Sequence, residues 1–138
     1  MNLTAVTAVP ANFKPVKVLI VDDNEAMRRT IKSVIQDLVD EIVECDDGEA
    51  ALRYYRTFRP DWIVMDIRMK EMDGLTATRA IKSSFAGARV VIVTSYDEPS
   101  LREEAASAGA CAYVLKDDLS QLIALLTNCR SRPGHFDV

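Results

Sequence analysis

The chain has 138 residues, of which 49% are hydrophobic and 28% charged, a composition typical of one globular domain rather than a disordered segment. Seventeen Lys and Arg residues against 21 Asp and Glu residues give a formal net charge of −4. A domain with this charge is poorly suited to follow a nucleic-acid backbone by itself. The length also argues against a sensing module and an output module in the same chain.

The cysteines and the histidine exclude several kinds of site. Cys45, Cys111 and Cys129 are widely spaced without a C-x-x-C motif, which favours reduced thiols over a disulfide framework or a zinc site. The chain has a single histidine, His135. One histidine cannot form a His-rich metal centre, and it also argues against a Ser-His-Asp triad. The N-terminus has no basic start, and no apolar run approaches the ~18 residues that span a bilayer. We therefore expect a soluble, cytoplasmic protein without a signal peptide.

Short apolar runs rich in β-branched residues alternate with amphipathic patterns along the chain. Strands are predicted at 16–21, 42–45, 62–66, 89–94 and 112–115. Helices are predicted from a cap at Asp23 or Asn24 through Leu38, and at 49–58, 74–83, 99–108 and 119–129. Alternating strands and helices predict a parallel sheet covered by helices on both faces, with its ligands at the carboxyl ends of the strands.

Charged and hydroxyl side chains stand at those carboxyl ends. Asp22 and Asp23 follow the first predicted strand, Asp66 ends the third, Thr94 ends the fourth and Lys116 follows the fifth. Three carboxylates at one edge repel one another, and carboxylate oxygens are ligands that Mg²⁺ prefers. Any one of these aspartates alone is better explained as a helix cap or turn residue. The joint pattern favours a magnesium site, because one Mg²⁺ and one lysine cancel the charge of three carboxylates.

A carboxylate in such a site can also act as a nucleophile toward a phosphoryl group. If Asp66 accepts the group, its charge of about −1 becomes about −2. Lys116 and the metal would then bind phosphoryl oxygens, and the Thr94 hydroxyl would donate a hydrogen bond to another. Phosphoryl transfer requires mainly positioning and this neutralisation of charge.

Five short segments together resemble one known family: Val21-Asp22-Asp23-Asn24, Met65-Asp66-Ile67, Met72-Asp73-Gly74-Leu75, Val93-Thr94-Ser95 and Tyr113-Val114-Leu115-Lys116. The chain resembles the receiver domain of bacterial two-component response regulators over residues 16–129. The resemblance implies a flavodoxin-like, doubly wound α/β fold with five helices and a five-stranded parallel sheet in the order 2-1-3-4-5. Residues 1–15 would then be an N-terminal extension and residues 130–138 a C-terminal tail.

The resemblance implies the ligands of the metal site. Asp66 would be the phosphoacceptor. Asp23 and Asp66 would bind Mg²⁺ together with the backbone carbonyl of Arg68, while Asp22 would assist through a water molecule.

The resemblance also implies a switch. Thr94 would be the switch hydroxyl and Lys116 the phosphate-binding cation. Tyr113 would turn inward when Thr94 moves toward the phosphoryl group, which reshapes the surface of the fourth helix, fifth strand and fifth helix. An ordinary half-buried strand aromatic is the alternative for Tyr113.

The sequence departs from the family pattern near the predicted site. Met69-Lys70 stands where the family often has Met-Pro, and Asp117 follows Lys116 where many members have Pro. Arg68 and Tyr96 lie two residues after Asp66 and Thr94, at places where side chains tune the lifetime of the aspartyl phosphate in this family. Two bulky side chains there predict slow hydrolysis.

The resemblance implies a sensor histidine kinase or phosphotransfer protein as the donor and an effector protein as the target. It implies no direct nucleic-acid or membrane binding, a monomer or phosphorylation-dependent dimer, and no turnover beyond the chain's own phosphorylation and dephosphorylation. Two alternatives stay open: the receiver part of a helix-turn-helix transcription factor, and an interaction module that is never phosphorylated.

Other functions of this fold class fit the sequence less well. The acidic segment Asp22-Asp23-Asn24-Glu25 would repel the phosphate of a flavin cofactor. Neither G-x-G-x-x-G nor a P-loop motif occurs. An aspartyl-phosphate phosphatase would carry its nucleophile on the first strand, whereas Asp66 lies on the third.

Overall fold

Five strands and five helices alternate along residues 15–131, the part of the chain that the computed structural model describes, with side chains described through Asn128. The strands are β1 (Lys17–Val21), β2 (Glu41–Cys45), β3 (Trp62–Met65), β4 (Val90–Thr94) and β5 (Ala112–Leu115). The helices are α1 (Glu25–Ile35), α2 (Gly48–Phe58), α3 (Gly74–Ser84), α4 (Pro99–Ala108) and α5 (Ser120–Ser131).

The strands form one parallel sheet in the order β2-β1-β3-β4-β5, which confirms the predicted flavodoxin-like fold. In three of the four strand pairs the last residues are in register: Val21 pairs with both Cys45 and Met65, and Thr94 pairs with Leu115. Strand β4 extends two residues beyond β3, whose Met65 pairs with Ile92. The loops that follow the strands therefore start from one edge of the sheet, the carboxyl edge.

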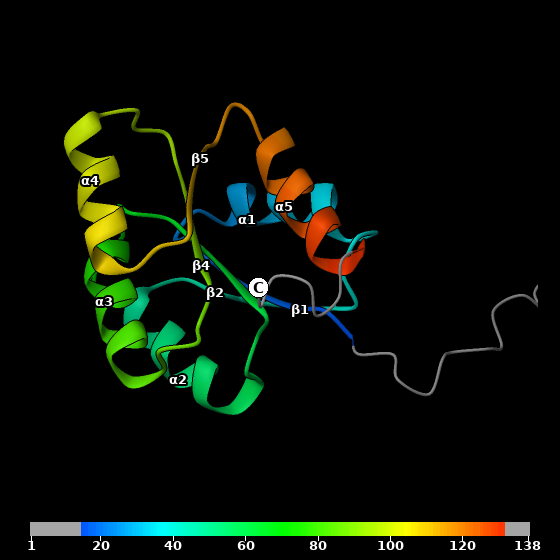
Figure 1. Cartoon of the computed structure of the whole chain (residues 1–138), viewed down its shortest axis with the longest axis horizontal. Coiled ribbons are helices and arrows are strands. Elements are labelled where there is room, and N and C mark those ends of the chain that lie inside the picture. Colours follow the sequence, from blue (N-terminus) through cyan, green and yellow to red (C-terminus); the bar gives the residue numbers. More distant parts are fainter. Residues whose placement is uncertain (1–14, 132–138) are drawn as a thin grey trace, which may run out of the picture.

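Helices cover both faces of the sheet, with α2, α3 and α4 on one face and α1 and α5 on the other (Figure 1). Each face has its own core of buried side chains. Strand residues that point to one face, such as Leu19, Ile63 and Ile92, pack with α2, α3 and α4. Their neighbours in sequence pack with α1 and α5, which explains the continuous apolar runs of β1, β3 and β4.

Side-chain caps begin three of the helices, and the cap of α1 lies at Asn24, one of the two residues predicted for it. The side chains of Asn24, Asp47 and Asp73 each accept a hydrogen bond at 2.8 Å from a backbone N–H in the first turn of α1, α2 and α3. Pro99 stands at the start of α4, and Gly109 ends it with φ 105°, a left-handed conformation that glycine adopts without a steric penalty.

Most boundaries lie within one residue of the predicted ones, and three of the differences bear on the core, the site or the last helix. Helix α1 ends at Ile35, and the N–H of Leu38 donates to the carbonyl of Ile35 in a turn, although Leu38 still packs against the core on the α1 and α5 face. Strand β3 ends at Met65, so Asp66 is the first residue of the loop. Helix α5 continues to Ser131, two residues beyond the predicted end, because residues 129–131 contain neither glycine nor proline.

Cys45 and Cys111 are free thiols. Burial raises the pKa of the Cys45 thiol to about 12, so it is an inert core residue at neutral pH. The side chain of Cys129 and the predicted tail residue His135 lie outside the described residues. Within residues 15–131, no helix has both the length and the apolar character needed to cross a bilayer.

Candidate functional site

The three aspartates predicted to form a metal site lie together at the carboxyl edge. One carboxylate oxygen from each of Asp22, Asp23 and Asp66 lies within 4.8 Å of the other two. Asp22 and Asp66 are buried, with 1% and 5% of their surface exposed, while Asp23 is more open to solvent. Adjacent strands produce this arrangement, because β1 and β3 pair directly and end in register.

Backbone N–H groups orient the two buried carboxylates. Asp22 Oδ1 accepts from the N–H of Asn24, and Asp66 Oδ1 accepts from the N–H of Ile67, each at 2.9 Å. One oxygen of each carboxylate is thereby held by the loop that follows its strand. A set of carboxylate oxygens this close together fits a hard divalent cation such as Mg²⁺.

Lys116 reaches both buried aspartates from the end of β5. Its Nζ lies 3.0 Å from Asp22 Oδ2 and 3.4 Å from Asp66 Oδ2. Burial alone would lower the pKa of Lys116, but the hydrogen bond to Asp22 and the charges of Asp66 and Asp22 outweigh it and raise the pKa. The lysine therefore stays charged at neutral pH and offsets one of the carboxylates.

The charge of Asp66 is only partly compensated. Burial, and then the neighbouring carboxylate of Asp22, raise the pKa of Asp66 from 3.8 to about 6, against the opposing effects of Lys116 and the N–H of Ile67. Because ionised Asp66 is unfavourable beside two other carboxylates, a bound cation would stabilise the site.

Thr94 and Tyr113 bind the two polar backbone groups of one loop residue, Tyr96. The N–H of Tyr96 donates to Thr94 Oγ1 at 3.3 Å, and the Tyr113 hydroxyl donates to the carbonyl of Tyr96 at 2.6 Å. Thr94 is fully buried at the end of β4, whereas Tyr113 is half-buried and lies outside the carboxylate cluster. Burial raises the pKa of the Tyr113 hydroxyl.

Arg68 also contacts Tyr96. The Arg68 guanidinium carbon lies 4.5 Å from the centre of the Tyr96 ring, a distance typical of a cation–π interaction. The two residues that were predicted to flank the site on separate loops thus touch each other. The role of the Arg68 backbone carbonyl as a metal ligand stays a prediction.

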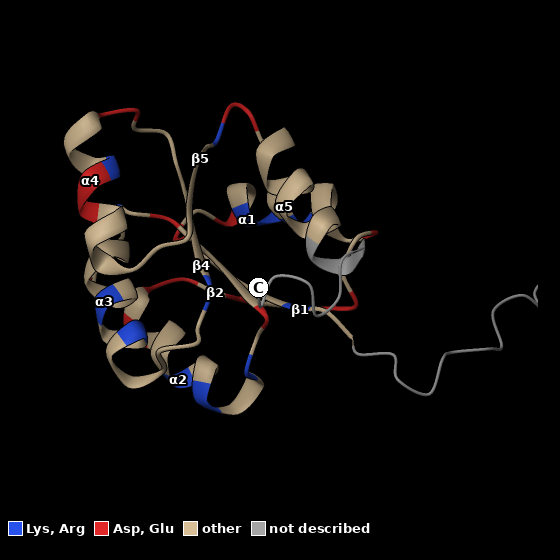
Figure 2. Cartoon of the chain, viewed as in Figure 1, with Lys and Arg blue, Asp and Glu red and all other residues tan. Residues whose placement is uncertain are grey.

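Acidic residues also gather in the neighbouring loops, as Figure 2 shows for the segment before α4 and the segment between β5 and α5. These segments contain Asp97, Glu98, Asp117 and Asp118. The carboxyl edge is therefore acidic beyond the cluster itself, which raises the local concentration of cations.

Two further residues, Gly74 and Arg28, shape the site in ways that were not predicted. A Cβ atom on Gly74 would overlap the carbonyl oxygen of Asp66, so only glycine fits where α3 begins beside the acidic cluster. The Arg28 side chain donates to the carbonyl of Asp22 at 2.7 Å. A sequence signal for Arg28 existed, since it stands three and seven residues before Ile31 and Ile35, on the buried stripe of α1.

Comparison with known proteins agrees with this geometry. Residues 18–127 match the family model described as the response regulator receiver domain. The chain is 35% identical over 100 residues to the chemotaxis protein CheY of Halobacterium salinarum, covering 72% of this chain and 83% of CheY. It is 37% identical over 112 residues to the response regulator protein VraR of Staphylococcus saprophyticus, covering 80% of this chain but only 54% of VraR.

The fold is also found in a solved structure of the CheX-CheY-BeF3-Mg²⁺ complex from Borrelia burgdorferi. The match has a TM-score of 0.75 and 25% sequence identity, and it covers 83% of this chain and 87% of the matched chain. Because the family model spans most of the sequence and the acidic residues meet at the carboxyl edge of the expected sheet, the chain belongs to the family of response regulator receiver domains.

Proposed function

We propose that this chain is a phosphorylation-dependent switch in which Asp66 accepts a phosphoryl group with the help of Mg²⁺. The observation that carries the proposal is the meeting of Asp22, Asp23 and Asp66 within 4.8 Å, with Lys116 in contact with the two buried carboxylates. A cluster that repels itself lacks a structural purpose of its own, whereas phosphoryl transfer requires this concentration of charge-balancing groups.

In the proposed reaction, a carboxylate oxygen of Asp66 attacks phosphorus and forms an acyl phosphate. The bond from phosphorus to the donor breaks, which releases histidine from a phosphohistidine or acetate from acetyl phosphate. At neutral pH most Asp66 side chains are ionised, because the pKa of about 6 lies below the pH of the reaction. Lys116, held 3.4 Å from Asp66, balances the charge that arrives.

The cluster also accounts for the proposed cofactor. Asp23 and Asp66 would bind Mg²⁺ with the Arg68 carbonyl, and Asp22 would assist through water. When bound, Mg²⁺ supplies positive charge that stabilises the transferring group. The presence of Mg²⁺ in the related Borrelia burgdorferi complex supports this choice of cation.

The contacts of Tyr96 support the proposed switch. Thr94 holds the N–H of Tyr96 and Tyr113 holds its carbonyl, so both switch residues act on the same peptide segment. When Thr94 turns toward the phosphoryl group, it releases the N–H of Tyr96, and the loop and Tyr113 become free to move. A local change of charge would thus alter the surface of α4, β5 and α5.

We propose a histidine kinase or phosphotransfer protein as the donor and a downstream protein as the target, both in the cytoplasm. In this account, residues 16–129 act as one receiver unit, either as a monomer or as a phosphorylation-dependent dimer. A second candidate is the receiver part of a longer DNA-binding regulator. The chain is 38% identical to the transcriptional regulatory protein YdfI of Bacillus subtilis and covers only 51% of it, which favours this candidate. Contacts of the full-length gene product with DNA would distinguish the two.

Intact-mass spectrometry after incubation with acetyl phosphate and Mg²⁺ tests the proposal. We expect one added phosphoryl group, no addition without Mg²⁺, and no addition to Asp66→Asn. Asp61→Asn is the matched control, because Asp61 lies before β3 and Asp66 after it. Labelling of the Asp66→Asn variant would refute the acceptor, and failure of the native chain to be labelled would favour a module that acts without phosphorylation.

A further inference from the structure

Arg28 occupies an unusual place for a charged side chain. It lies in the first turns of α1 on the stripe that continues with the fully buried Ile31 and Ile35. Only 17% of its side chain is exposed. A guanidinium in such a place costs solvation free energy and must be compensated by specific partners.

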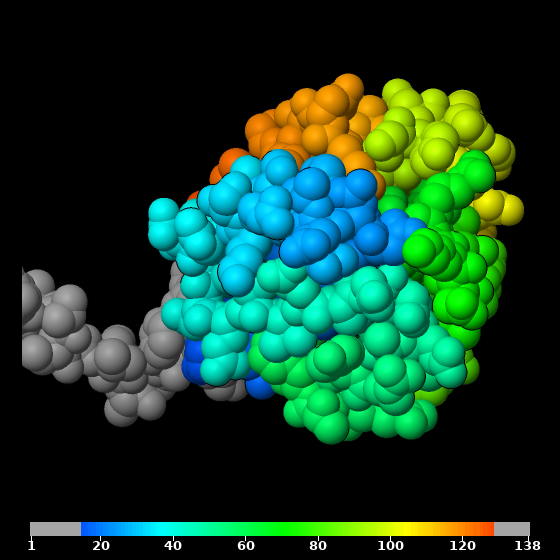
Figure 3. All heavy atoms as spheres, turned by 180° about the vertical axis from the view of Figure 1, so that it is seen from behind, coloured from blue at the N-terminus to red at the C-terminus, as the bar shows by residue number. Residues whose placement is uncertain are grey.

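The partners of Arg28 are Asp22, the first residue after β1, and Glu44 on β2. Its Nη1 donates to the carbonyl oxygen of Asp22 at 2.7 Å, and its Nε lies 3.0 Å from Glu44 Oε1 on β2. Lys32, one turn further along α1, reaches the other oxygen of Glu44 at 3.6 Å. In Figure 3, α1 lies directly beside the segment that contains β2 and α2. The contacts with Glu44 therefore connect α1 to β2.

These contacts complete the fixation of Asp22. Its N–H donates to the carbonyl of Cys45 at 3.2 Å, and its two carboxylate oxygens contact the N–H of Asn24 and Nζ of Lys116. The bond from Arg28 fixes the remaining polar group, the carbonyl. Because a peptide unit is planar, fixing this carbonyl also fixes the direction in which the chain enters Asp23.

We propose that Arg28 is a positioning residue of the metal site, which sets the peptide between Asp22 and Asp23 and thereby the Asp23 carboxylate, with Glu44 holding the guanidinium in place. The inference rests on the proposed binding of Mg²⁺ by this cluster. It assigns to Arg28 a part in metal binding although Arg28 is not itself a ligand.

Charge and geometry predict opposite effects for removing Arg28, which makes the inference testable. By charge alone, loss of a cation near three carboxylates strengthens the binding of Mg²⁺. By geometry, loss of the bond to the Asp22 carbonyl weakens it, as loss of an outer-shell contact commonly weakens metal binding. If Arg28 served only the folding of the chain, its removal would lower the stability and leave the affinity for Mg²⁺ unchanged.

The test is a Mg²⁺ titration followed by ¹H–¹⁵N NMR, which reports folding and affinity in the same spectra. We expect Arg28→Lys, which keeps the charge but loses the two-pronged geometry, to weaken binding about 10-fold, the lower end for outer-shell changes. Arg28→Ala should weaken it at least as much, provided that it folds. Glu44→Gln, which keeps a hydrogen-bond acceptor for Arg28, should weaken it less.

Two control variants separate positioning from charge. Lys32→Ala removes a cation that binds the same Glu44 from one turn further along α1. Arg29→Ala removes an exposed cation that pairs with Glu25 at 3.5 Å. Both should leave the affinity for Mg²⁺ unchanged or slightly higher.

Unchanged or tighter binding by folded Arg28→Lys would overturn the inference while leaving the proposed function intact. Absence of Mg²⁺ binding by the native chain would overturn both. Weaker binding by the Arg28 variants but not by the controls, with shifts centred on the amides of Asp22 and Asp23, would support the positioning role.

Discussion

At the amino edge of the sheet, Asp40 and Asp61 each accept a hydrogen bond from a backbone N–H where β1 begins, at 2.6 and 2.8 Å. At the carboxyl edge, in contrast, Asp22, Asp23 and Asp66 converge within 4.8 Å. The residue type is the same, but its energetic role differs. An aspartate that binds a backbone N–H stabilises the fold, while a cluster of aspartates costs stability until a cation or phosphoryl group arrives.

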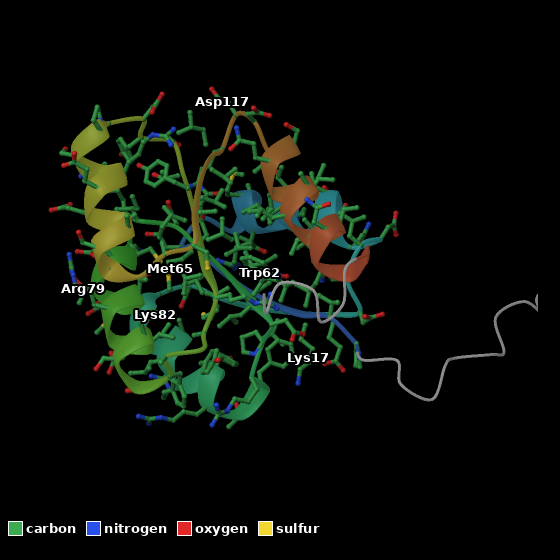
Figure 4. The ribbon with its side chains drawn as sticks, in the orientation of Figure 1. Lys17, Trp62, Met65, Arg79, Lys82 and Asp117 are labelled. Carbon is green, nitrogen blue, oxygen red and sulfur yellow. The ribbon has the colours of Figure 1, made fainter. Side chains whose placement is uncertain are left out.

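Figure 4 labels one residue at each edge. Lys17, at the start of β1, belongs to the amino edge, and Asp117, after β5, belongs to the carboxyl edge. At the amino edge, the loops return the chain to the next strand, and Arg89 Nε donates to the carbonyl of Asp61 at 3.1 Å. The aspartates of the amino edge thus stabilise the sheet, whereas in the proposed function the aspartates of the carboxyl edge bind a cation and a phosphoryl group. Variants at matched positions of the two edges test this difference.

The largest effect is expected from Lys116→Met. Loss of the cation beside Asp22 and Asp66 should lower the rate of phosphorylation by acetyl phosphate roughly 100- to 1,000-fold, as for other groups that stabilise developing charge. Lys17→Met, at the amino edge, should keep the native rate. Equal rates for the two variants, measured by intact mass against time, would remove the distinction between the edges.

The burial and repulsion of the carboxylates at the carboxyl edge should also make the free energy of unfolding depend on pH. Because the pKa of Asp66 is raised from 3.8 to about 6, the folded state binds this proton more tightly than the unfolded state. The free energy of unfolding should therefore fall as pH rises from about 4 to about 6, by about 3 kcal/mol for the raised pKa.

Urea unfolding at several pH values measures this loss. Asp66→Asn should abolish it and be the more stable protein at pH 7, and millimolar Mg²⁺ should restore the stability of the native chain. A native chain whose stability rises over that pH range relative to Asp66→Asn would contradict the assigned cost.

Two glycines offer the next comparison. In Gly74→Ala, the new methyl group would overlap the Asp66 carbonyl, so we expect a loss of roughly 2–3 kcal/mol and slower phosphorylation. Gly87 stands before β4 at the amino edge, where an added Cβ meets no atom within 4 Å. Gly87→Ala should change stability by less than about 0.5 kcal/mol, as thermal unfolding of both variants will establish.

Among the expected losses, the smallest concerns the amino edge itself. Asp61→Ala removes the hydrogen bond to the N–H of Lys17 and should cost about 1.5–2 kcal/mol of stability, the lower part of the range for bonds to a charged group. Its rate of phosphorylation at a temperature where it is folded should equal that of the native chain. A slower rate would show that the two edges are coupled through the sheet.

The sequence allowed the site to be predicted because parallel strands end at one edge. The order of strand ends placed Asp22, Asp66 and Lys116 together without any side-chain detail, and the structure brings them within contact. The bond from Arg28 to the Asp22 carbonyl was not predicted, because it depends on how α1 is rotated and seated above β1 and β2. The turn that ends α1 was not predicted either: the helix ends at Ile35, although the apolar pattern continues to Leu38.

The central claim is that one carboxylate of the cluster, Asp66, receives the phosphoryl group. Borohydride reduction of the phosphorylated chain converts an aspartyl phosphate to homoserine, which peptide mass spectrometry can locate. We expect Mg²⁺-dependent homoserine at position 66 and at no other aspartate. Homoserine at position 22 or 23, or phosphate retained on another residue type, would contradict it.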